Sequence, residues 1–236
     1  MAVLGPPGPQ PGELQAGEPA RAYALDALRQ AILGGDLAPG QRLIEEELAA
    51  ELSVTRASLR AALIELTAEG LVERVPNKGA RVRVVTADEA VEITECRMAL
   101  EALCAVKAAE RVTDEQIEAL RELGEGLKRS VADGDPLKYS AANTELHRVV
   151  YAISGQTVAV ELLARLNAQL VRYQFQLAQR PGRPEQSLGE HLAIIDAIIR
   201  RDPVAADEAT RRHLSSVITA LRAADPRQTS KPAKRK

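Results

Sequence analysis

Hydrophobic residues recur at helical spacing near the start of the chain. Leu25, Leu28 and Ile32 follow one another at intervals of three or four residues, which is the spacing of one helix face. A pair of glycines at positions 34–35 interrupts the pattern, because glycine favours the end of a helix over its interior. We therefore predict a first helix over residues 20–33.

Two more helical patterns follow. A turn at Ala38-Pro39-Gly40 precedes a short amphipathic stretch over residues 45–52. After a break at residues 53–54, Thr55 is the predicted N-cap of a third helix that ends near Gly70. The leucines of this third helix point one way and its two arginines another, so it has one buried side and one cationic side.

Beyond the third helix the pattern changes. The segment LVERVPNKGARVRVV contains two β-rich runs separated by Pro76-Asn77-Lys78-Gly79, which is a hairpin signal. Helix, helix, short turn, helix and hairpin is the order of a winged helix-turn-helix. Its third helix enters a DNA major groove with the amino end first, and its hairpin reaches the neighbouring backbone or minor groove. We assign residues 20–85 to such a DNA-binding domain.

Positive charge is concentrated in this predicted domain. Residues 54–85 carry six cations and three anions, a net charge of +3, whereas the chain as a whole has a formal charge of −2. A protein of that overall charge does not coat nucleic acid, so its contacts must be local. Two arginines alone would be typical of a solvated helix face, but the ordered turn, the cap and the basic wing favour DNA. The residues expected within reach of a duplex are Thr55, Arg56, Ser58 and Arg60 on the third helix and Lys78 in the wing.

From residue 86 onward the pattern is that of long amphipathic helices. Thr86-Ala87-Asp88-Glu89 opens a helix that runs to about residue 111, and a second capping box begins at Thr113. Asp135-Pro136 opens the next helix and Ser154-Gly155 ends it, and three more are expected over residues 158–179, 184–201 and 203–224. We predict an all-α bundle of six to seven helices over residues 86–224, so that the fold is mainly α.

The composition indicates which residues fill the core and in which cell compartment the protein is expected. The chain is 45% hydrophobic but only 2% aromatic, so Leu, Ala, Val and Ile must fill the interior. Cys96 and Cys104 on one helix would lie about 12 Å apart, too far for a disulfide. With no apolar run long enough to span a membrane and no signal peptide, we expect a cytoplasmic protein. Residues 1–19 and the basic residues 225–236 are predicted disordered tails.

The sequence contains three histidines, and each falls on a different predicted helix of the second half. His191 shares its helix face with isoleucines and His213 shares its face with alanines and a valine, so both are expected to point into the bundle. Buried imidazoles are costly unless each has a partner. Histidines on facing helices are a common first-row metal site, so we favour a shared ligand set that includes His147. The alternative is three core histidines with separate hydrogen bonds.

The first half resembles a known family. LAPGQRLIEEELAAELSVTRASLRAALIELTAEGLVERVPNKGARV looks like the DNA-binding domain of the GntR family of bacterial transcription regulators. The DNA contacts that the resemblance implies are base reading by Arg56 and Arg60, phosphate binding by Thr55 and Ser58, and a wing tip formed by Gly79. Glu46 stands in a stretch where many relatives place an arginine near the DNA backbone, so we expect that contact to be weakened or unused.

The second half resembles the ligand-sensing FCD domain of FadR-type GntR regulators. The matching stretches are TECRMALEALCAVKAA, NTELHRVVYAISG, EHLAIIDAII and AADEATRRHL. Many members bind a divalent metal through one Asp and three His, which implies the ligands His147, His191 and His213, with Asn143 in the Asp position. An amide is a weaker donor than a carboxylate, so we expect a Zn²⁺ or Ni²⁺ site of reduced affinity, with a metal-free variant as the alternative. Arg97 is expected to meet an effector carboxylate or, alternatively, to form a salt bridge with Glu101.

These resemblances imply a ligand-controlled regulator. One helix-turn-helix covers only a few base pairs, so we expect a homodimer on a palindromic double-stranded operator. A small carboxylate effector in the helical domain would alter operator binding, and relief of repression is the commoner pattern in similar proteins. The alternatives are a three-histidine metal-dependent hydrolase and a sensor that acts through protein partners. The sequence lacks an HExxH motif, a phosphate loop and a nucleophile elbow, and the basic wing disfavours the second alternative.

Overall fold

A computed structural model describes residues 16–76 and 79–224 of the chain. The chain divides into two compact units, with the boundary between Val85 and Thr86, and each unit is described by itself. Most of the predicted disordered tails, residues 1–15 and 225–236, and the predicted wing residue Lys78 lie outside the described residues.

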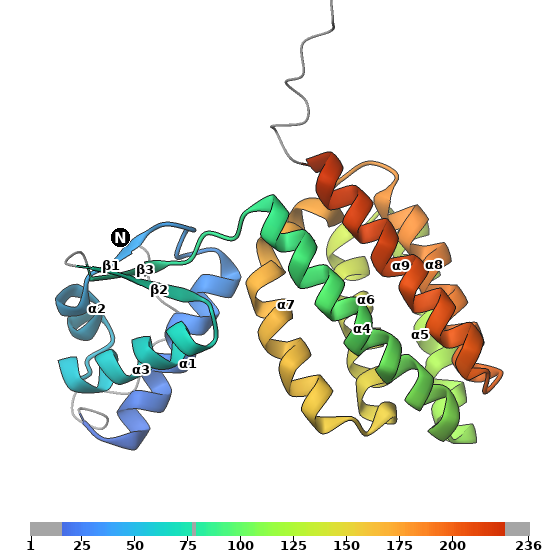
Figure 1. Cartoon of the computed structure of the whole chain (residues 1–236), viewed down its shortest axis with the longest axis horizontal. Helices are drawn as coiled ribbons and strands as arrows, with labels where there is room; N and C mark the ends of the chain where they lie inside the picture. Colours follow the sequence, from blue (N-terminus) through green and yellow to red (C-terminus); the bar gives the residue numbers. More distant parts are fainter. Residues whose placement is uncertain (1–15, 77–78, 225–236) are drawn as a thin grey trace, which may run out of the picture. The chain divides into compact units, whose positions relative to one another are not determined.

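The first unit combines three helices with a small sheet. Its elements are α1 (Glu18–Gly34), β1 (Arg42–Leu43), α2 (Glu45–Glu51), α3 (Arg56–Ala68), β2 (Val72–Val75) and β3 (Gly79–Val82). The strands form an antiparallel sheet in the order β1-β3-β2 (Figure 1). The predicted winged helix-turn-helix is therefore confirmed. β1 was not predicted, because two residues are too few to show an alternating pattern.

The core of the first unit lies between α1 and α3. The side of α1 that packs inward is formed by Ala20, Ala24, Leu28 and Ala31, whereas Leu25 and Ile32, which share the helical spacing of Leu28, are only half-buried. Small side chains on α1 let α3 approach closely, and Leu59, Leu63 and Leu66 of α3 are fully buried there. One side of α3 is thus fixed in the core, which holds the opposite side outward.

The second unit, residues 86–224, consists of helices joined by short turns, and the structure describes this range without a gap. Its helices are α4 (Ala87–Arg111), α5 (Asp114–Ala132), α6 (Pro136–Ser154), α7 (Thr157–Ala178), α8 (Arg183–Ile199) and α9 (Pro203–Ala224). The predicted caps are present: the Thr86 side chain accepts a hydrogen bond from the Glu89 N–H, and Thr113 forms a reciprocal capping box with Gln116. These local signals explain why the number and order of these helices followed from the sequence.

Aliphatic and alanine side chains fill the second unit. α4 and α9 run side by side (Figure 1), and α5, α6 and α8 share a core with them that includes the fully buried Leu120, Leu127 and Ile198. Cys96 and Cys104 both lie on α4 and are unpaired. Among the described residues, no helix is both long enough and apolar enough to cross a membrane.

Candidate functional site

The outward side of α3 presents two arginines. The Arg56 and Arg60 side chains are 62% and 57% exposed, in contrast to the fully buried leucines on the other side of the helix. Thr55 is the N-cap, as predicted, and its Oγ1 accepts a hydrogen bond from the Ser58 N–H. The helix therefore begins at a defined residue and carries its cations on the first two turns.

Ser58 differs from the expectation. It is buried, and its hydroxyl lies 3.0 Å from the Thr55 hydroxyl. The sequence placed it on the leading turn of the helix, but the third position of a helix faces back toward the N-cap. The Ser58 hydroxyl is thus part of the cap rather than a group exposed to a DNA phosphate.

Both exposed arginines are paired with carboxylates of α2. Arg60 donates from Nε and Nη2 to Glu45 Oε2 at 3.0 and 2.7 Å, and Arg56 donates to Glu46. The hydrogen bond from Arg60 holds the pKa of the Glu45 carboxyl below its ordinary value. Sequence reasoning missed Glu45, although the run of three glutamates that opens α2 was a visible signal. Any anionic partner of these arginines would have to replace both carboxylates.

The hairpin forms the expected wing. Gly79 begins β3 with a φ of 82°, a conformation that favours glycine, and Cβ at this position would meet no atom within 4 Å. Arg74 and Arg81 lie on the two strands with exposed side chains, and Arg81 Nε donates to Glu73 Oε1 at 2.6 Å. The first unit thus offers a basic helix and a basic hairpin to a partner.

The second unit contains a pocket of about 330 Å³. Its lining comes from α4, α6, α7, α8 and α9 and includes Arg97, Asn143, His147, Arg183, His191 and His213. The volume is at the lower end of the range usual for sites that hold small molecules.

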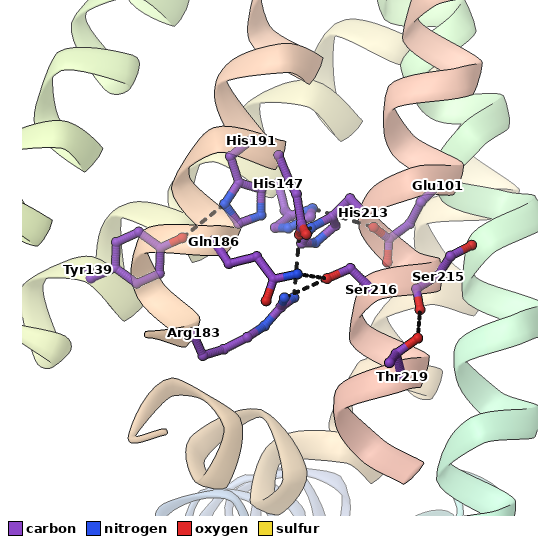
Figure 2. Close-up of polar contacts among 11 residues, drawn as sticks. Glu101, Tyr139, His147, Arg183, Gln186, His191, His213, Ser215, Ser216 and Thr219 are labelled. Atoms are coloured by element: carbon purple, nitrogen blue, oxygen red, sulfur yellow. Dashed lines mark hydrogen bonds and ion pairs between the residues drawn. The ribbon is translucent and has the colours of Figure 1, made fainter. Parts of the chain in front are cut away.

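The three histidines meet in this pocket. The rings of His191 and His213 have centroids 4.4 Å apart, and His147 lies 5.5 Å from the first and 6.1 Å from the second. Figure 2 shows the rings gathered between Tyr139 and Glu101. One ring nitrogen from each histidine lies within 4.8 Å of the others, a cluster able to hold a metal ion. The expected convergence is confirmed.

Each Nδ1 atom faces an oxygen. His191 Nδ1 lies 3.2 Å from the Tyr139 hydroxyl. His213 Nδ1 lies 2.8 Å from Glu190 Oε2, and His147 Nδ1 lies 3.5 Å from Glu101 Oε2. A proton on each Nδ1 satisfies these oxygens and leaves a lone pair on each Nε2, which is the usual arrangement around metal-binding histidines.

Three buried polar atoms of the pocket lining have no hydrogen-bond partner among the described residues. They are Asn143 Oδ1, the Tyr151 hydroxyl and His191 Nε2. Leaving such atoms unpaired costs free energy, so their presence at the wall of a pocket points to a ligand. Asn143 Oδ1 and His191 Nε2 can each donate an electron pair, and together with the other two imidazoles they fit a borderline metal such as Zn²⁺ or Ni²⁺.

The charges around the histidines are well defined. Burial lowers the pKa of His147 to about 4 although Glu101 opposes the shift, and burial also lowers the pKa of His191 well below its ordinary value. Burial disfavours the charged form of Glu101, but Arg97 and His147 outweigh it and hold its pKa below the ordinary value. At neutral pH the imidazoles of His147 and His191 are therefore uncharged donors beside an ionised carboxylate.

Of the two roles considered for Arg97 from the sequence, the salt bridge is present and contact with an effector stays a prediction. Arg97 lines the pocket, and it also forms a buried ion pair with Glu101, donating from Nε and Nη2 to Oε1 at 2.9 and 2.7 Å. The helical salt bridge is present, and Nη1 is the nitrogen that this pair does not use.

A second Arg–Glu pair was missed by the sequence reasoning. Arg183 Nη2 lies 3.4 Å from Glu190 Oε2, and Arg183 Nη1 donates to Ser216 at 2.6 Å. Burial raises the pKa of Glu190, but the hydrogen bonds from His213 and Ser216 and the charge of Arg183 together outweigh it and lower the pKa overall. The position of Glu190 directly before His191 was the only signal available for it.

A winged helix-turn-helix with exposed arginines, together with a helical unit that encloses a polar pocket, defines a ligand-controlled transcription regulator. Residues 21–82 match the bacterial regulatory proteins of the gntR family, and residues 92–216 match the FCD domain. The chain therefore belongs to the GntR family of bacterial transcription regulators and carries an FCD domain.

Similar proteins agree with this assignment. The chain is 30% identical to the HTH-type transcriptional repressor NanR of Cronobacter sakazakii, over 87% of the chain and 86% of that protein. It is 24% identical to the repressor RspR of Escherichia coli K12, over 89% and 92% of the two chains. The fold is similar to that of a GntR regulator of Rhodococcus sp. RHA1, with a TM-score of 0.70 and 26% identity over 88% and 99% of the chains. The family consists of transcription regulators, so the hydrolase alternative is not favoured.

Proposed function

We propose that this protein is a repressor that binds a palindromic operator as a homodimer and responds to a small organic acid bound together with a divalent metal. The observation that carries the proposal is the three-histidine pocket in a chain whose other unit is a winged helix-turn-helix. The repressors among its relatives support the direction of the response.

In the first unit, Arg56 and Arg60 are proposed to read the DNA bases. Their exposure on the first turns of α3 supports this role, since the amino end of the recognition helix enters the major groove. Thr55 at the N-cap and Gly79 in the wing are proposed to lie against the DNA backbone, and Lys78 is proposed as a phosphate contact on sequence grounds.

At the sensor end, His147, His191 and His213 would hold the ion, and Asn143 Oδ1 would be a fourth, neutral donor. The metal, when bound, would supply a positive charge that attracts an oxygen of the acid. Tyr139, Glu101 and Glu190 orient the three rings through their Nδ1 atoms. Arg97 is proposed to bind the acid through Nη1, while Nε and Nη2 stay bonded to Glu101.

An apolar surface on α4 and α7 supports the homodimer. Leu103, Val158 and Leu162 are 39%, 70% and 44% exposed, and each is adjacent in sequence to a residue of the buried cluster that joins the two helices. Exposed apolar side chains around a buried helix contact are typical of a surface covered by another protein. A second copy of the chain is the partner that a palindromic operator requires.

The proposed switch couples the two ends. An acid that binds one dimer arrangement better than another changes the spacing of the two recognition helices, and coupling of about 1–3 kcal/mol is the usual scale. By linkage, operator DNA would change acid affinity by the same factor.

The test uses the purified full-length chain. Metal content by emission spectroscopy and bound acids by mass spectrometry are measured on one sample, and operator duplexes are selected from a random library. We expect one Zn²⁺ or Ni²⁺ per chain after metal addition, loss of that metal in His191→Ala, and retention in the pocket-wall variant Gln174→Ala. No selected palindrome would contradict the DNA proposal, and no metal after addition of either ion would contradict the sensor proposal.

A further inference from the structure

Glu45 of α2 lies between α3 and the hairpin of the first unit. One of its carboxylate oxygens, Oε2, accepts hydrogen bonds from Arg60 Nε and Nη2 at 3.0 and 2.7 Å. The other oxygen, Oε1, lies 3.9 Å from Nη2 of Arg74 on β2. The Glu45 side chain is 27% exposed, whereas those of the two arginines are 57% and 51% exposed. A half-buried carboxylate thus contacts one exposed guanidinium of α3 and lies near another on the hairpin.

The contact with Glu45 uses only one edge of the Arg60 guanidinium. This planar group has five N–H donors, and the two that face Glu45 lie along the edge from Nε to Nη2. The N–H groups of Nη1 and the second N–H of Nη2 take no part in this contact. Together these two nitrogens form a fork that matches O6 and N7 of guanine in the major groove. Arg60 can therefore keep Glu45 and read a guanine at the same time.

The carboxylate also distinguishes between the DNA groups that an arginine binds. A phosphate is an anion, so its contact with Arg60 would bring a second negative group close to Glu45. A guanine edge has no net charge, and Glu45 does not have to leave for it to bind. In addition, a long arginine side chain loses rotamer freedom when it binds a base, and two hydrogen bonds already order Arg60 before DNA arrives.

Glu46 is the next residue of α2, but its contact is of another kind. Its side chain is 75% exposed, and its hydrogen bond comes from Nη2 of Arg56. Nη2 is one of the two nitrogens that form the fork for a guanine, so Glu46 occupies a donor that a base would use. The same charge on the same short helix thus competes with DNA at Glu46 and orders an arginine at Glu45.

We propose that Glu45 is a positioning residue that orders Arg60 so that the free edge of its guanidinium reads a guanine of the operator rather than a phosphate. The inference rests on the proposed reading of DNA bases by Arg60. Glu45 acts through Arg60 and does not itself contact the DNA. Its removal therefore lowers the discrimination between bases without lowering the general attraction of the first unit to DNA.

The experiment compares specific with non-specific DNA binding of the full-length chain. Operator duplexes are selected from a random library, and each guanine of the half-site is replaced in turn by adenine in both half-sites. Affinities are measured by fluorescence anisotropy for these duplexes and for a scrambled duplex. The guanine read by Arg60 is the one whose replacement weakens wild-type binding by about 5–160-fold but weakens binding of Arg60→Ala by less than about 2-fold.

Glu45→Gln and Glu46→Gln are a matched pair, because each removes one negative charge from α2 and each breaks a surface ion pair of small energy. Both variants should bind the scrambled duplex more tightly, by similar factors, since the loss of an anion strengthens the attraction to phosphates. At the guanine read by Arg60, discrimination should fall at least about 3-fold in Glu45→Gln and stay within about 2-fold of wild type in Glu46→Gln. Circular dichroism establishes that the variants are folded.

A double variant tests whether Glu45 acts through Arg60. Glu45→Gln/Arg60→Ala should discriminate at this guanine to the same extent as Arg60→Ala, because the residue that Glu45 orders is already absent. A further loss in the double variant would overturn the proposal, since Glu45 would then affect the base by another route.

The remaining outcomes separate the inference from the function beneath it. Unchanged discrimination in Glu45→Gln, or an equal loss in Glu46→Gln, would overturn the positioning role while leaving Arg60 as a base-reading residue. If Arg60→Ala keeps full discrimination at every guanine of the half-site, base reading by Arg60 itself is overturned.

Discussion

The ion pair of Arg97 and Glu101 is almost wholly buried, which makes Glu101→Gln an informative perturbation of the sensor unit. The Glu101 side chain is 2% exposed and that of Arg97 is 8% exposed. One carboxylate oxygen accepts two hydrogen bonds from the guanidinium, and the other lies 3.5 Å from His147 Nδ1. The amide variant keeps the shape of the side chain but leaves the guanidinium buried without a counter-charge.

The size of the effect follows from this geometry. At 2.7 Å and an effective dielectric constant of about 20, the attraction between the two charges is about 6 kcal/mol. Desolvation offsets much of this, yet removal of one partner of a buried pair still costs about 3–5 kcal/mol. We expect Glu101→Gln to lower the free energy of unfolding by that amount. The double variant Arg97→Gln/Glu101→Gln removes both charges and should be destabilised by only about 1–2 kcal/mol.

Urea denaturation of the metal-free protein, followed by circular dichroism at neutral pH, measures both effects. Glu110→Gln is the matched control, because Glu110 lies on the same helix and pairs with Lys107 at the surface. That control should change the free energy of unfolding by about 0.5 kcal/mol or less. A cost of less than about 1 kcal/mol for Glu101→Gln, or a double variant no more stable than the single one, would refute this account of the buried pair.

Three further predictions concern DNA binding and pH. Arg56→Ala and Arg60→Ala should each weaken specific operator binding by roughly 1–3 kcal/mol for every base that the arginine no longer reads, and unchanged anisotropy titrations would remove these residues from base reading. Glu46→Gln should strengthen operator binding about 1.4–5-fold, since the exposed pair with Arg56 is worth about 0.2–1 kcal/mol, and weaker binding would show that Glu46 assists instead. In metal-free protein, the pKa of His147 is lowered to about 4 from 6.5, so the unfolded chain takes up the proton first. His147 alone should therefore lower the stability by up to about 3 kcal/mol as the pH falls from 6.5 toward 4. A flat urea midpoint over that range, or the same slope in His147→Gln, would contradict this.

The parts of the fold that followed from the sequence are those with local causes. Thr113 and Gln116 cap α5 through contacts three residues apart, so a short motif fixes the start of the helix. β1 has no such motif, because its two residues become a strand only by pairing with Arg81 and Ala80 of β3. On α1 the spacing of Leu25, Leu28 and Ile32 indicated a helix, but close packing buried Leu28 with three alanines rather than with the other two large residues.

In the candidate site, too, the features with local causes followed from the sequence and the contacts between distant residues did not. Periodicity placed the histidines inward, but their partners come from contacts across the bundle: Tyr139 and His191 are 52 residues apart in sequence, and Glu190 and His213 are 23 apart. Glu190 directly precedes His191, so a helix directs the two side chains about 100° apart. Only the packing of α9 against α8 brings His213 to Glu190, and no local pattern encodes that contact.

The two ends of the protein use arginine–glutamate pairs differently, and exposure decides how. The pairs of Arg56 and Arg60 lie at the surface, where replacing a carboxylate by a phosphate or a base costs about 0.2–1 kcal/mol per pair. The pairs of Arg97 and Arg183 are buried, and separating them would cost about 3–5 kcal/mol, more than the 1–3 kcal/mol that allosteric coupling usually supplies. The proposed acid would therefore not draw either buried arginine from its glutamate. It would bind with both pairs intact, and the proposed ion beside the histidines would supply the positive charge.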